Sequence, residues 1–318
     1  METGSVSVVI PVYNSSATLG LLMERVERVL RGLGVGYEVV LVDDGSRDGS
    51  WRAIEELRRG RSWISAIQLP RNYGQHAALL CGIRAAAGER IVTMDDDLQN
   101  PPEEIVRLLE RLEETGGVVY GVPERRRHGL WRNISSGVVT LALSQVMGVE
   151  AARKVSPFRA FPASVREAFA GYQSPYVSID ALLSWGAARF EAVTVRHDAR
   201  QAGASQYTLG KLVTHGVNMV AGFSTLPLRM ASILGFTAAA FGLLVLAFVM
   251  GRYWMEGGSL PGFPFLASVI AIFSGVQLFA LGIIGEYLAR MHTRMMDRPP
   301  YVVARRLESR VEKAGHAG

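Results

Sequence analysis

Apolar residues follow two alternating spacings over the first two hundred residues of the chain. Runs of consecutive, mostly β-branched apolar residues predict strands that are buried on both faces. Segments with apolar residues three and four positions apart predict amphipathic helices between them. The predicted strands are residues 6–12, 39–42, 64–69, 90–94 and 190–196. The predicted helices are residues 19–30, 51–57, 75–87 and a segment from 101 to 116. This alternation is typical of an α/β fold with a mostly parallel sheet covered on both faces. Asn14 and Ser15 are the candidate N-caps of the first helix.

Two long uncharged runs follow in the C-terminal third. Residues 230–251 and 257–285 contain no Asp, Glu, Lys or Arg. A helix rises about 1.5 Å per residue, so either run is long enough to cross a hydrocarbon layer about 30 Å thick. We therefore predict two transmembrane helices within residues 229–289, joined by a short external loop, in preference to two buried core helices.

The segments that border these runs predict the topology. Apolar residues interleaved with polar ones predict an amphipathic membrane-interface segment at residues 206–228. The tail, residues 290–318, holds seven Lys and Arg against three Asp and Glu. The positive-inside rule places this basic tail in the cytoplasm and, with two spans, also the N-terminal domain of residues 1–205. The N-terminus shows no secretory signal pattern. We thus expect a multi-pass protein of the cell (inner or plasma) membrane with both termini cytoplasmic.

Composition narrows the class of partner. Charged residues make up 20% of the chain and hydrophobic residues 49%, too few charges for a disordered protein. The single cysteine, Cys81, excludes an internal disulfide and a four-cysteine zinc cluster. The net charge of +5 favours an anionic partner: nucleic acid, a membrane surface or a phosphorylated substrate. We expect no nucleic-acid binding, because the arginines lie beside acidic motifs and in the tail, without a recognisable nucleic-acid module.

Polar motifs follow three of the predicted strands. Residues 11–14 (PVYN) follow the first strand, residues 43–46 (DDGS) the second and residues 95–99 (DDDLQ) the fourth. Ligands of parallel α/β sheets bind at the carboxyl ends of the strands, so these motifs mark the candidate site. Taken alone, DDGS is an ordinary turn sequence.

The triple aspartate is the strongest of these signals. Adjacent carboxylates raise one another's pKa unless a cation offsets their charge. Asp95 and Asp97 share one side of an extended segment and, with Gln99 as a neutral third ligand, form an oxygen-only set. Such a set fits Mg²⁺ or Mn²⁺. The alternative is a solvated acidic turn.

Two nucleotide-binding motifs are excluded by glycine placement. Gly32, Gly34 and Gly36 lie between the first predicted helix and the second predicted strand. The dinucleotide fingerprint requires glycines between the first strand and the first helix instead. The sequence also contains no G-x-x-x-x-G-K-[ST], so the P-loop is absent.

The ordered motifs resemble a known family. VVIPVYN, VDDGSRDGS and MDDDLQNPPE, in this order and spacing, resemble the inverting family-2 glycosyltransferases with a GT-A fold. Residues 156–159 (SPFR), 196–207 (RHDARQAGASQY) and 284–288 (IGEYL) resemble the branch that transfers a sugar to a polyprenyl phosphate. Dolichol-phosphate mannose synthases and bacterial undecaprenyl-phosphate glucosyl- or aminoarabinosyl-type transferases belong to it. The resemblance covers nearly the whole chain and implies a Rossmann-like GT-A domain, interface helices and two transmembrane helices.

The resemblance also implies roles on the donor side. The nucleotide pocket would be formed by Pro11, Tyr13, Val42 and Asp44, of which Asp44 would face the base. The donor diphosphate and the metal would be lined by Asp95, Asp96, Asp97 and Gln99.

On the acceptor side, Arg125 and Arg127 match arginines that meet phosphate. Arg200 and Gln206 would flank the loop that closes over the donor, although many relatives carry lysine at the position of Gln206. Pro157 stands where some relatives place an acid. A phosphate monoester is already largely anionic at neutral pH, since its second pKa is near 6. We therefore assign no general base, and expect the arginines to help bring two anions together.

These observations predict metal-dependent, inverting transfer of a sugar from a nucleotide-sugar, expected to be a UDP-sugar, to polyprenyl phosphate at the cytoplasmic membrane face. Two alternatives stay open. A processive polysaccharide synthase would carry a Q-x-x-R-W segment and more spans, and the sequence contains neither. A non-enzymatic, membrane-tethered nucleotide-sugar-binding scaffold would not need the intact acidic triplet. The sequence leaves open whether the chain forms a homo-oligomer.

Overall fold

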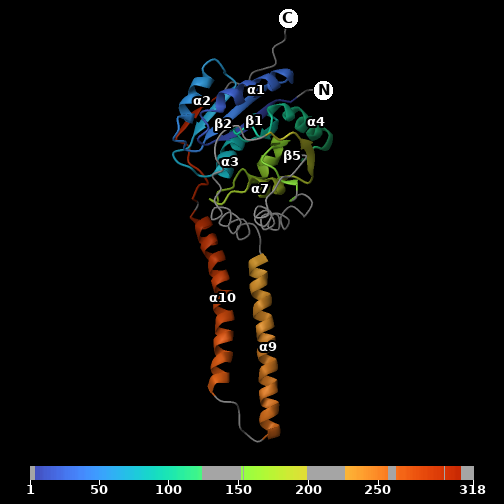
Figure 1. Cartoon of the computed structure of the whole chain (residues 1–318), viewed down its shortest axis with the longest axis vertical. Coiled ribbons are helices and arrows are strands. Elements are labelled where there is room, and N and C mark those ends of the chain that lie inside the picture. The colour runs from blue at the N-terminus through green and yellow to red at the C-terminus, as the bar shows by residue number, and fades with distance from the viewer. Residues whose placement is uncertain are drawn as a thin grey trace.

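A mixed sheet forms the centre of an α/β domain, from which two long helices extend (Figure 1). The computed structural model describes residues 4–123, 152, 154–198, 226–256, 263–296 and 298–308. Within them the strand order is β7-β5-β6-β4-β1-β2-β3-β8. The strands are β1 (Val6–Val12), β2 (Tyr37–Asp43), β3 (Ile64–Gln68), β4 (Arg90–Thr93), β5 (Val118–Pro123), β6 (Arg159–Pro162), β7 (Phe190–Val195) and β8 (Arg305–Leu307).

Most neighbouring strands are parallel, as the sequence predicts. β1 pairs in parallel with β2 and β4, β2 with β3, and β5 with β7. Two strands run against them: β6 lies antiparallel between β4 and β5, and β8 is antiparallel to β3. The sequence pattern did not predict β5, β6 or β8. Of these, β6 and β8 are short and contain arginine or proline.

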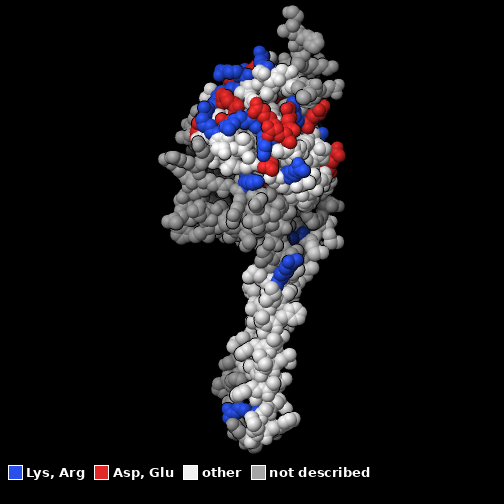
Figure 2. All heavy atoms as spheres, turned by 90° about the vertical axis from the view of Figure 1, so that its right-hand side faces the viewer, with Lys and Arg blue, Asp and Glu red and all other residues white. Residues whose placement is uncertain are grey.

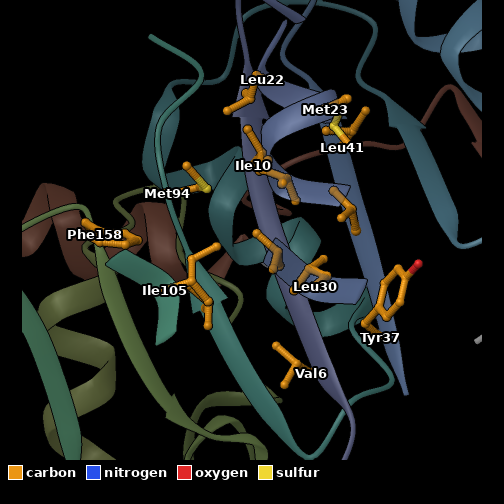
Figure 3. Close-up of a cluster of buried hydrophobic side chains, with 14 of the residues drawn as sticks. Val6, Ile10, Leu22, Met23, Leu30, Tyr37, Leu41, Met94, Ile105 and Phe158 are labelled. Atoms are coloured by element: carbon orange, nitrogen blue, oxygen red, sulfur yellow. The ribbon is translucent and has the colours of Figure 1, made fainter. Parts of the chain in front are cut away.

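Helices cover both faces of the sheet. The helices of the domain are α1 (Leu19–Gly32), α2 (Ser50–Arg58), α3 (Gln75–Ala85), α4 (Ile105–Thr115) and α7 (Ile179–Gly186), with 3-10 turns at η1 (Pro102–Glu104) and η2 (Ala163–Phe169). Successive strand side chains point to opposite faces. β1 therefore gives Val6, Val8 and Ile10 to a core with α1 and α4, part of which Figure 3 shows, and Val9 to a core with α3 and α7.

The predicted N-caps of the first helix are wrong. α1 starts at Leu19 after Thr18, whose side chain makes no cap hydrogen bond. Asn14 Oδ1 instead accepts the Arg47 N–H at 2.8 Å, and Ser15 Oγ donates to Asp96 Oδ2 at 2.5 Å. Both side chains are thus engaged with other strand-end loops rather than with the helix they precede.

The two predicted long helices are present. They are α9 (Leu226–Glu256) and α10 (Phe263–Met295). Pro227–Arg252 and Ile272–Thr293 are long and apolar enough to cross a membrane, with mean hydropathies of 2.5 and 1.6. Figure 2 shows a largely uncharged shaft below a domain rich in Lys, Arg, Asp and Glu. The helices touch closely, since a Cβ on Gly242 of α9 would lie 2.7 Å from Phe273 Cζ of α10.

The second helix is longer than the uncharged run within it. α10 continues past Gly285 and past residue 289, where we predict the membrane segment to end, to Met295. Glu286 and Arg290 are four positions apart on one helix face and form an ion pair at 2.6 Å. Such a pair, four positions apart, adds a small stabilisation to the helix where it continues beyond the uncharged run. The chain then returns to the domain, where β8 extends the sheet at β3.

Candidate functional site

The carboxyl ends of β1, β2 and β4 bring the three polar motifs together. At the end of β2, Asp44 is buried, and its two oxygens accept the backbone N–H groups of Tyr73 at 2.7 Å and Gly74 at 2.8 Å. Gly45 follows with φ +69°, and a Cβ there would lie 2.5 Å from the backbone of Arg71. DDGS is therefore more than a turn: its glycine permits the close approach of the segment that leads into α3.

Asp96 joins the end of β4 to the end of β1. Its Oδ2 accepts Ser15 Oγ at 2.5 Å and the Tyr13 N–H at 3.2 Å, and its carbonyl oxygen accepts Thr18 Oγ1 at 3.1 Å. Burial raises the pKa of Asp96, while the hydrogen bonds from Ser15 and Tyr13 lower it. Of the three aspartates, Asp96 is therefore the one that connects the loop after β4 to the loop after β1.

The other two aspartates have different partners. Asp95 Oδ1 accepts Gln75 Nε2 at 2.6 Å, and Asp97 Oδ1 accepts the Gln99 N–H at 3.1 Å. Leu98, between Asp97 and Gln99, is buried and has a φ of +59°, so the chain turns sharply after the triplet. The triplet is thus divided among three neighbours: α3, the β1 loop and its own turn.

The chemistry of this donor set fits a divalent metal. Asp95, Asp97 and Gln99 offer carboxylate and amide oxygens, the ligands that Mg²⁺ and Mn²⁺ accept. A carboxylate has two oxygens and about four lone-pair sites, so one accepted N–H is compatible with metal binding. In the described part of the chain, no three His, Cys, Asp or Glu side chains form a ready metal cluster. A metal here would therefore need further oxygens, such as those of a bound diphosphate.

The predicted nucleotide-pocket residues are neighbours in space. Pro11 and Val42 are register partners on β1 and β2, and both are buried. Val42 belongs to the core beneath α3. Tyr13 is half-buried, and its backbone contacts Asp96. The acceptor-side residues Arg125, Arg127, Arg200 and Gln206 lie outside the described residues.

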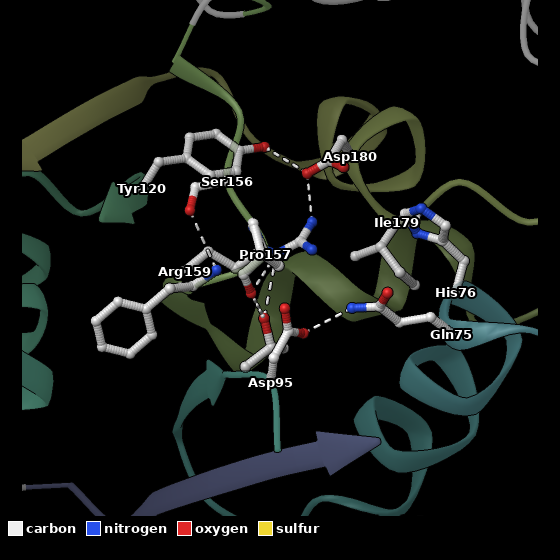
Figure 4. Close-up of polar contacts among 11 residues, drawn as sticks. Gln75, His76, Asp95, Tyr120, Ser156, Pro157, Arg159, Ile179 and Asp180 are labelled. Carbon is white, nitrogen blue, oxygen red and sulfur yellow. Dashed lines mark hydrogen bonds and ion pairs between the residues drawn. The ribbon is translucent and has the colours of Figure 1, made fainter. Parts of the chain in front are cut away.

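One charged cluster was missed by the sequence interpretation. Arg159 of β6 is buried, and its guanidinium pairs with Asp180 of α7 (Figure 4). Tyr120 Oη donates to the same Asp180 oxygen at 3.0 Å, and Arg159 Nε donates to Thr93 Oγ1 at 3.1 Å. In the sequence, SPFR indicated only the family resemblance, and no motif marked Asp180 as the partner of Arg159.

Asp44 gives the stability of the domain a specific pH dependence. Burial raises its pKa from 3.8 to about 6, against the hydrogen bonds from Tyr73 and Gly74 that lower it. Between pH 4 and 6 the folded state then binds more protons at Asp44 than the unfolded state does. The free energy of unfolding is therefore higher at pH 4 and falls as the pH rises to 6. Over this range we expect the free energy of unfolding of the wild type to fall relative to that of Asp44→Asn, on the order of 2 kcal/mol.

Asp48→Asn is the matched control. Burial raises the pKa of Asp48, but hydrogen bonds from Ser50 and Ser16 outweigh it and hold the pKa at about 2. Its stabilisation is present above about pH 4 and is lost as the pH falls towards 2. Between pH 4, 5 and 6 the melting temperatures of the wild type and of Asp48→Asn should therefore change by nearly the same amount. If the melting temperature of Asp44→Asn also follows that of the wild type, the raised pKa of Asp44 is contradicted.

Comparison with known proteins identifies the family. The model of "Glycosyl transferase family 2" matches residues 7–166. A Pseudomonas paraeruginosa protein named undecaprenyl-phosphate 4-deoxy-4-formamido-L-arabinose transferase is 38% identical over 307 residues, which cover 94% of this chain and 89% of the relative. A Yersinia enterocolitica protein of the same name is 35% identical over 305 residues, which cover 94% and 92%.

Solved structures agree on the fold. Glucosyl-3-phosphoglycerate synthase from Mycobacterium tuberculosis, in complex with Mn²⁺, UDP and glucosyl-3-phosphoglycerate, matches with a TM-score of 0.51 and 18% identity over 69% of this chain and 78% of that one. At this identity the match supports the fold alone, and it confirms the expected GT-A architecture. The family model and the two relatives confirm the resemblance seen in the sequence: the chain is a glycosyltransferase that belongs to glycosyl transferase family 2.

Proposed function

We propose that this glycosyltransferase moves a sugar from a nucleotide-sugar, a UDP-sugar, to polyprenyl phosphate. The observation that carries the acceptor assignment is the pair of helices α9 and α10, which are apolar enough to cross a membrane and extend from the GT-A domain. A lipid-borne phosphate stays at the membrane, and two spanning helices would hold the active site at the membrane surface where this phosphate lies. The names of the relatives, undecaprenyl-phosphate transferases, support the same acceptor class.

The reaction is a single displacement. An oxygen of the acceptor phosphate attacks the anomeric carbon as the bond from that carbon to the donor diphosphate breaks, which inverts the configuration. The products are a polyprenyl monophosphosugar and a nucleoside diphosphate. The phosphate is already an anion, so no side chain has to remove a proton from it. Pro157 has no acidic group, which is compatible with a reaction that needs no general base. Its carbonyl oxygen accepts a hydrogen bond from Thr93 Oγ1 at 2.9 Å.

The leaving diphosphate has to be stabilised. We assign Mg²⁺ or Mn²⁺ to Asp95, Asp97 and Gln99, where the metal when bound offsets the charge of the diphosphate. The fold neighbour binds Mn²⁺ and UDP, which favours a divalent metal in this fold; the placement at these three residues is our proposal. Asp96 keeps the β1 and β4 loops together beneath the donor, through Ser15 and Tyr13.

Arginines would bring the two anions together. Arg125, Arg127 and Arg200 remain our candidates for the acceptor phosphate, since guanidinium groups form charge-assisted, two-pronged hydrogen bonds with phosphate. Gln206 remains a candidate for the loop over the donor.

The helix pair α9 and α10 also bears on the membrane topology. The start of α9 and the end of α10 both lie on the side of the α/β domain (Figure 1). We therefore assign residues 1–205 and the basic tail 290–318 to the cytoplasmic side, residues 206–228 to the membrane interface and residues 229–289 to the bilayer.

The test is a transfer assay with the purified full-length protein. Labelled UDP-sugars are incubated with undecaprenyl phosphate and Mn²⁺, and the label in the lipid phase is measured. We expect one sugar per lipid and none with undecaprenol, which matches the acceptor but lacks the phosphate. Long polymeric products would indicate a polysaccharide synthase. Nucleotide binding without turnover on any acceptor would indicate a scaffold, and either result would refute the proposal.

A further inference from the structure

Four polar contacts, joined by short stretches of backbone, form a ring behind Asp95, the first aspartate of the acidic triplet. Figure 4 shows most of the residues of this ring. On one side Gln75, the first residue of α3, donates its Nε2 to Asp95 Oδ1 at 2.6 Å. The next residue, His76, accepts the backbone N–H of Ile179 on its Nδ1 at 3.3 Å. α3 is thereby attached at its start both to the triplet and to the first residue of α7.

The ring returns to Asp95 through the buried ion pair. Asp180 follows Ile179 on α7 and pairs with Arg159, whose Nε donates to Thr93 Oγ1 at 3.1 Å. Thr93 is the last residue of β4 and lies two positions before Asp95. We call the set of Thr93, Asp95, Gln75, His76, Asp180 and Arg159 the Asp95 ring.

The two halves of the ring differ in what they do. The side chains of Arg159 and Asp180 are 2% and 6% exposed, so the ion pair is a fixed support that joins β4, β6 and α7. Gln75, on the other half of the ring, is half-buried. Its side-chain amide donates to the Asp95 carboxylate. An N–H on one carboxylate oxygen restricts rotation of the carboxylate.

We propose that Gln75 is a positioning residue for glycosyl transfer. Its amide holds the Asp95 carboxylate in the orientation that meets the divalent cation and the donor diphosphate, and the rest of the Asp95 ring holds α3 in place for this contact. The inference rests on the proposed function, because it requires a metal at Asp95. Partners that orient a ligating carboxylate in this way typically contribute 10–100-fold to metal affinity.

The test compares Gln75→Met with Gln173→Met in the full-length protein. Methionine keeps the length of the side chain and favours helix, but it cannot donate to Asp95. Gln173 is an exposed glutamine outside the ring and serves as the control. Mn²⁺ binding in the presence of UDP is measured by the EPR signal of free Mn²⁺, together with the melting temperature, kcat and the KM for undecaprenyl phosphate.

We expect Gln75→Met to weaken Mn²⁺ binding about 10–100-fold, with an unchanged melting temperature and acceptor KM. Gln173→Met should match the wild type. Equal Mn²⁺ affinity in Gln75→Met and wild type would overturn this inference alone. A wild type that binds no Mn²⁺ in the presence of UDP would instead overturn the metal assignment of the proposed function. A melting temperature that falls in step with affinity would show that Gln75 serves the fold, which also overturns the inference.

Discussion

Asp97→Ala is expected to lower the rate of sugar transfer at least about 10³-fold with the α/β domain still folded. The metal that we assign to Asp95 and Asp97 offsets charge on the leaving diphosphate, an effect worth several kcal/mol, and each 1.36 kcal/mol is tenfold in rate. Asp97 is half-buried on the turn after β4, where its carboxylate accepts the Gln99 N–H. Initial rates with labelled donor and the melting temperature measure the two effects separately.

Glu114→Ala is the control for this variant. Glu114 is an exposed carboxylate at the end of α4 that pairs with Arg111, so its removal deletes the same charge away from the site. It should leave the rate within about twofold, as is usual for an exposed ion pair of small energy. If Asp97→Ala keeps more than a tenth of the wild-type rate, the assignment of the metal to Asp97 is wrong.

The largest expected effect on stability is that of Arg159→Met. The variant leaves the carboxylate of Asp180 buried without its cation, and breaking a buried pair from one side typically costs about 3–5 kcal/mol. For a domain of this size such a loss lowers the melting temperature by about 10 °C. Thermal unfolding of the full-length protein, followed by the signal of the α/β domain, measures it.

Two further variants separate charge from packing. Arg159→Met combined with Asp180→Leu should recover part of the loss, because no unpaired buried charge remains. Arg25→Met breaks the more exposed pair with Glu103 and should cost less than about 1 kcal/mol. Equal losses for Arg159→Met and Arg25→Met would show that the buried pair contributes no more than a surface one.

The elements that local patterns specify were predictable from the sequence. Buried strands such as β1 and β2 contain runs of consecutive apolar residues, and α4 ends at Gly116, which is in the left-handed conformation. The rule that ligands bind at carboxyl ends of parallel strands correctly brought Asp44 and the acidic triplet to one side of the sheet. Their exact partners were not predictable, because Tyr73 and Gly74 reach Asp44 from a different loop.

Long-range polar contacts explain what the sequence patterns did not predict. Ser15 lies 81 positions from Asp96, and this contact competes with the helix cap that local rules expect. Arg159 reaches Thr93 because β6 enters the sheet antiparallel to β4, 66 positions away. No periodicity over a few residues contains such a pairing, so neither the Asp95 ring nor its ion pair could be predicted.

The return of the chain to β3 has a consequence for any shortened form of this enzyme. β8 pairs with Ala66, Ile67 and Gln68, and Tyr301 packs against α3 beside the guanidinium of Arg84, 5.9 Å from its ring centroid. A version cut before α9 would lose this cover along with the apolar helices. β3 would then offer a row of unsatisfied backbone groups to a second copy, a template for aggregation. The C-terminal segment thus covers an edge of the sheet that would otherwise be open, so a truncation before α9 removes part of the catalytic domain together with the hydrophobic helices.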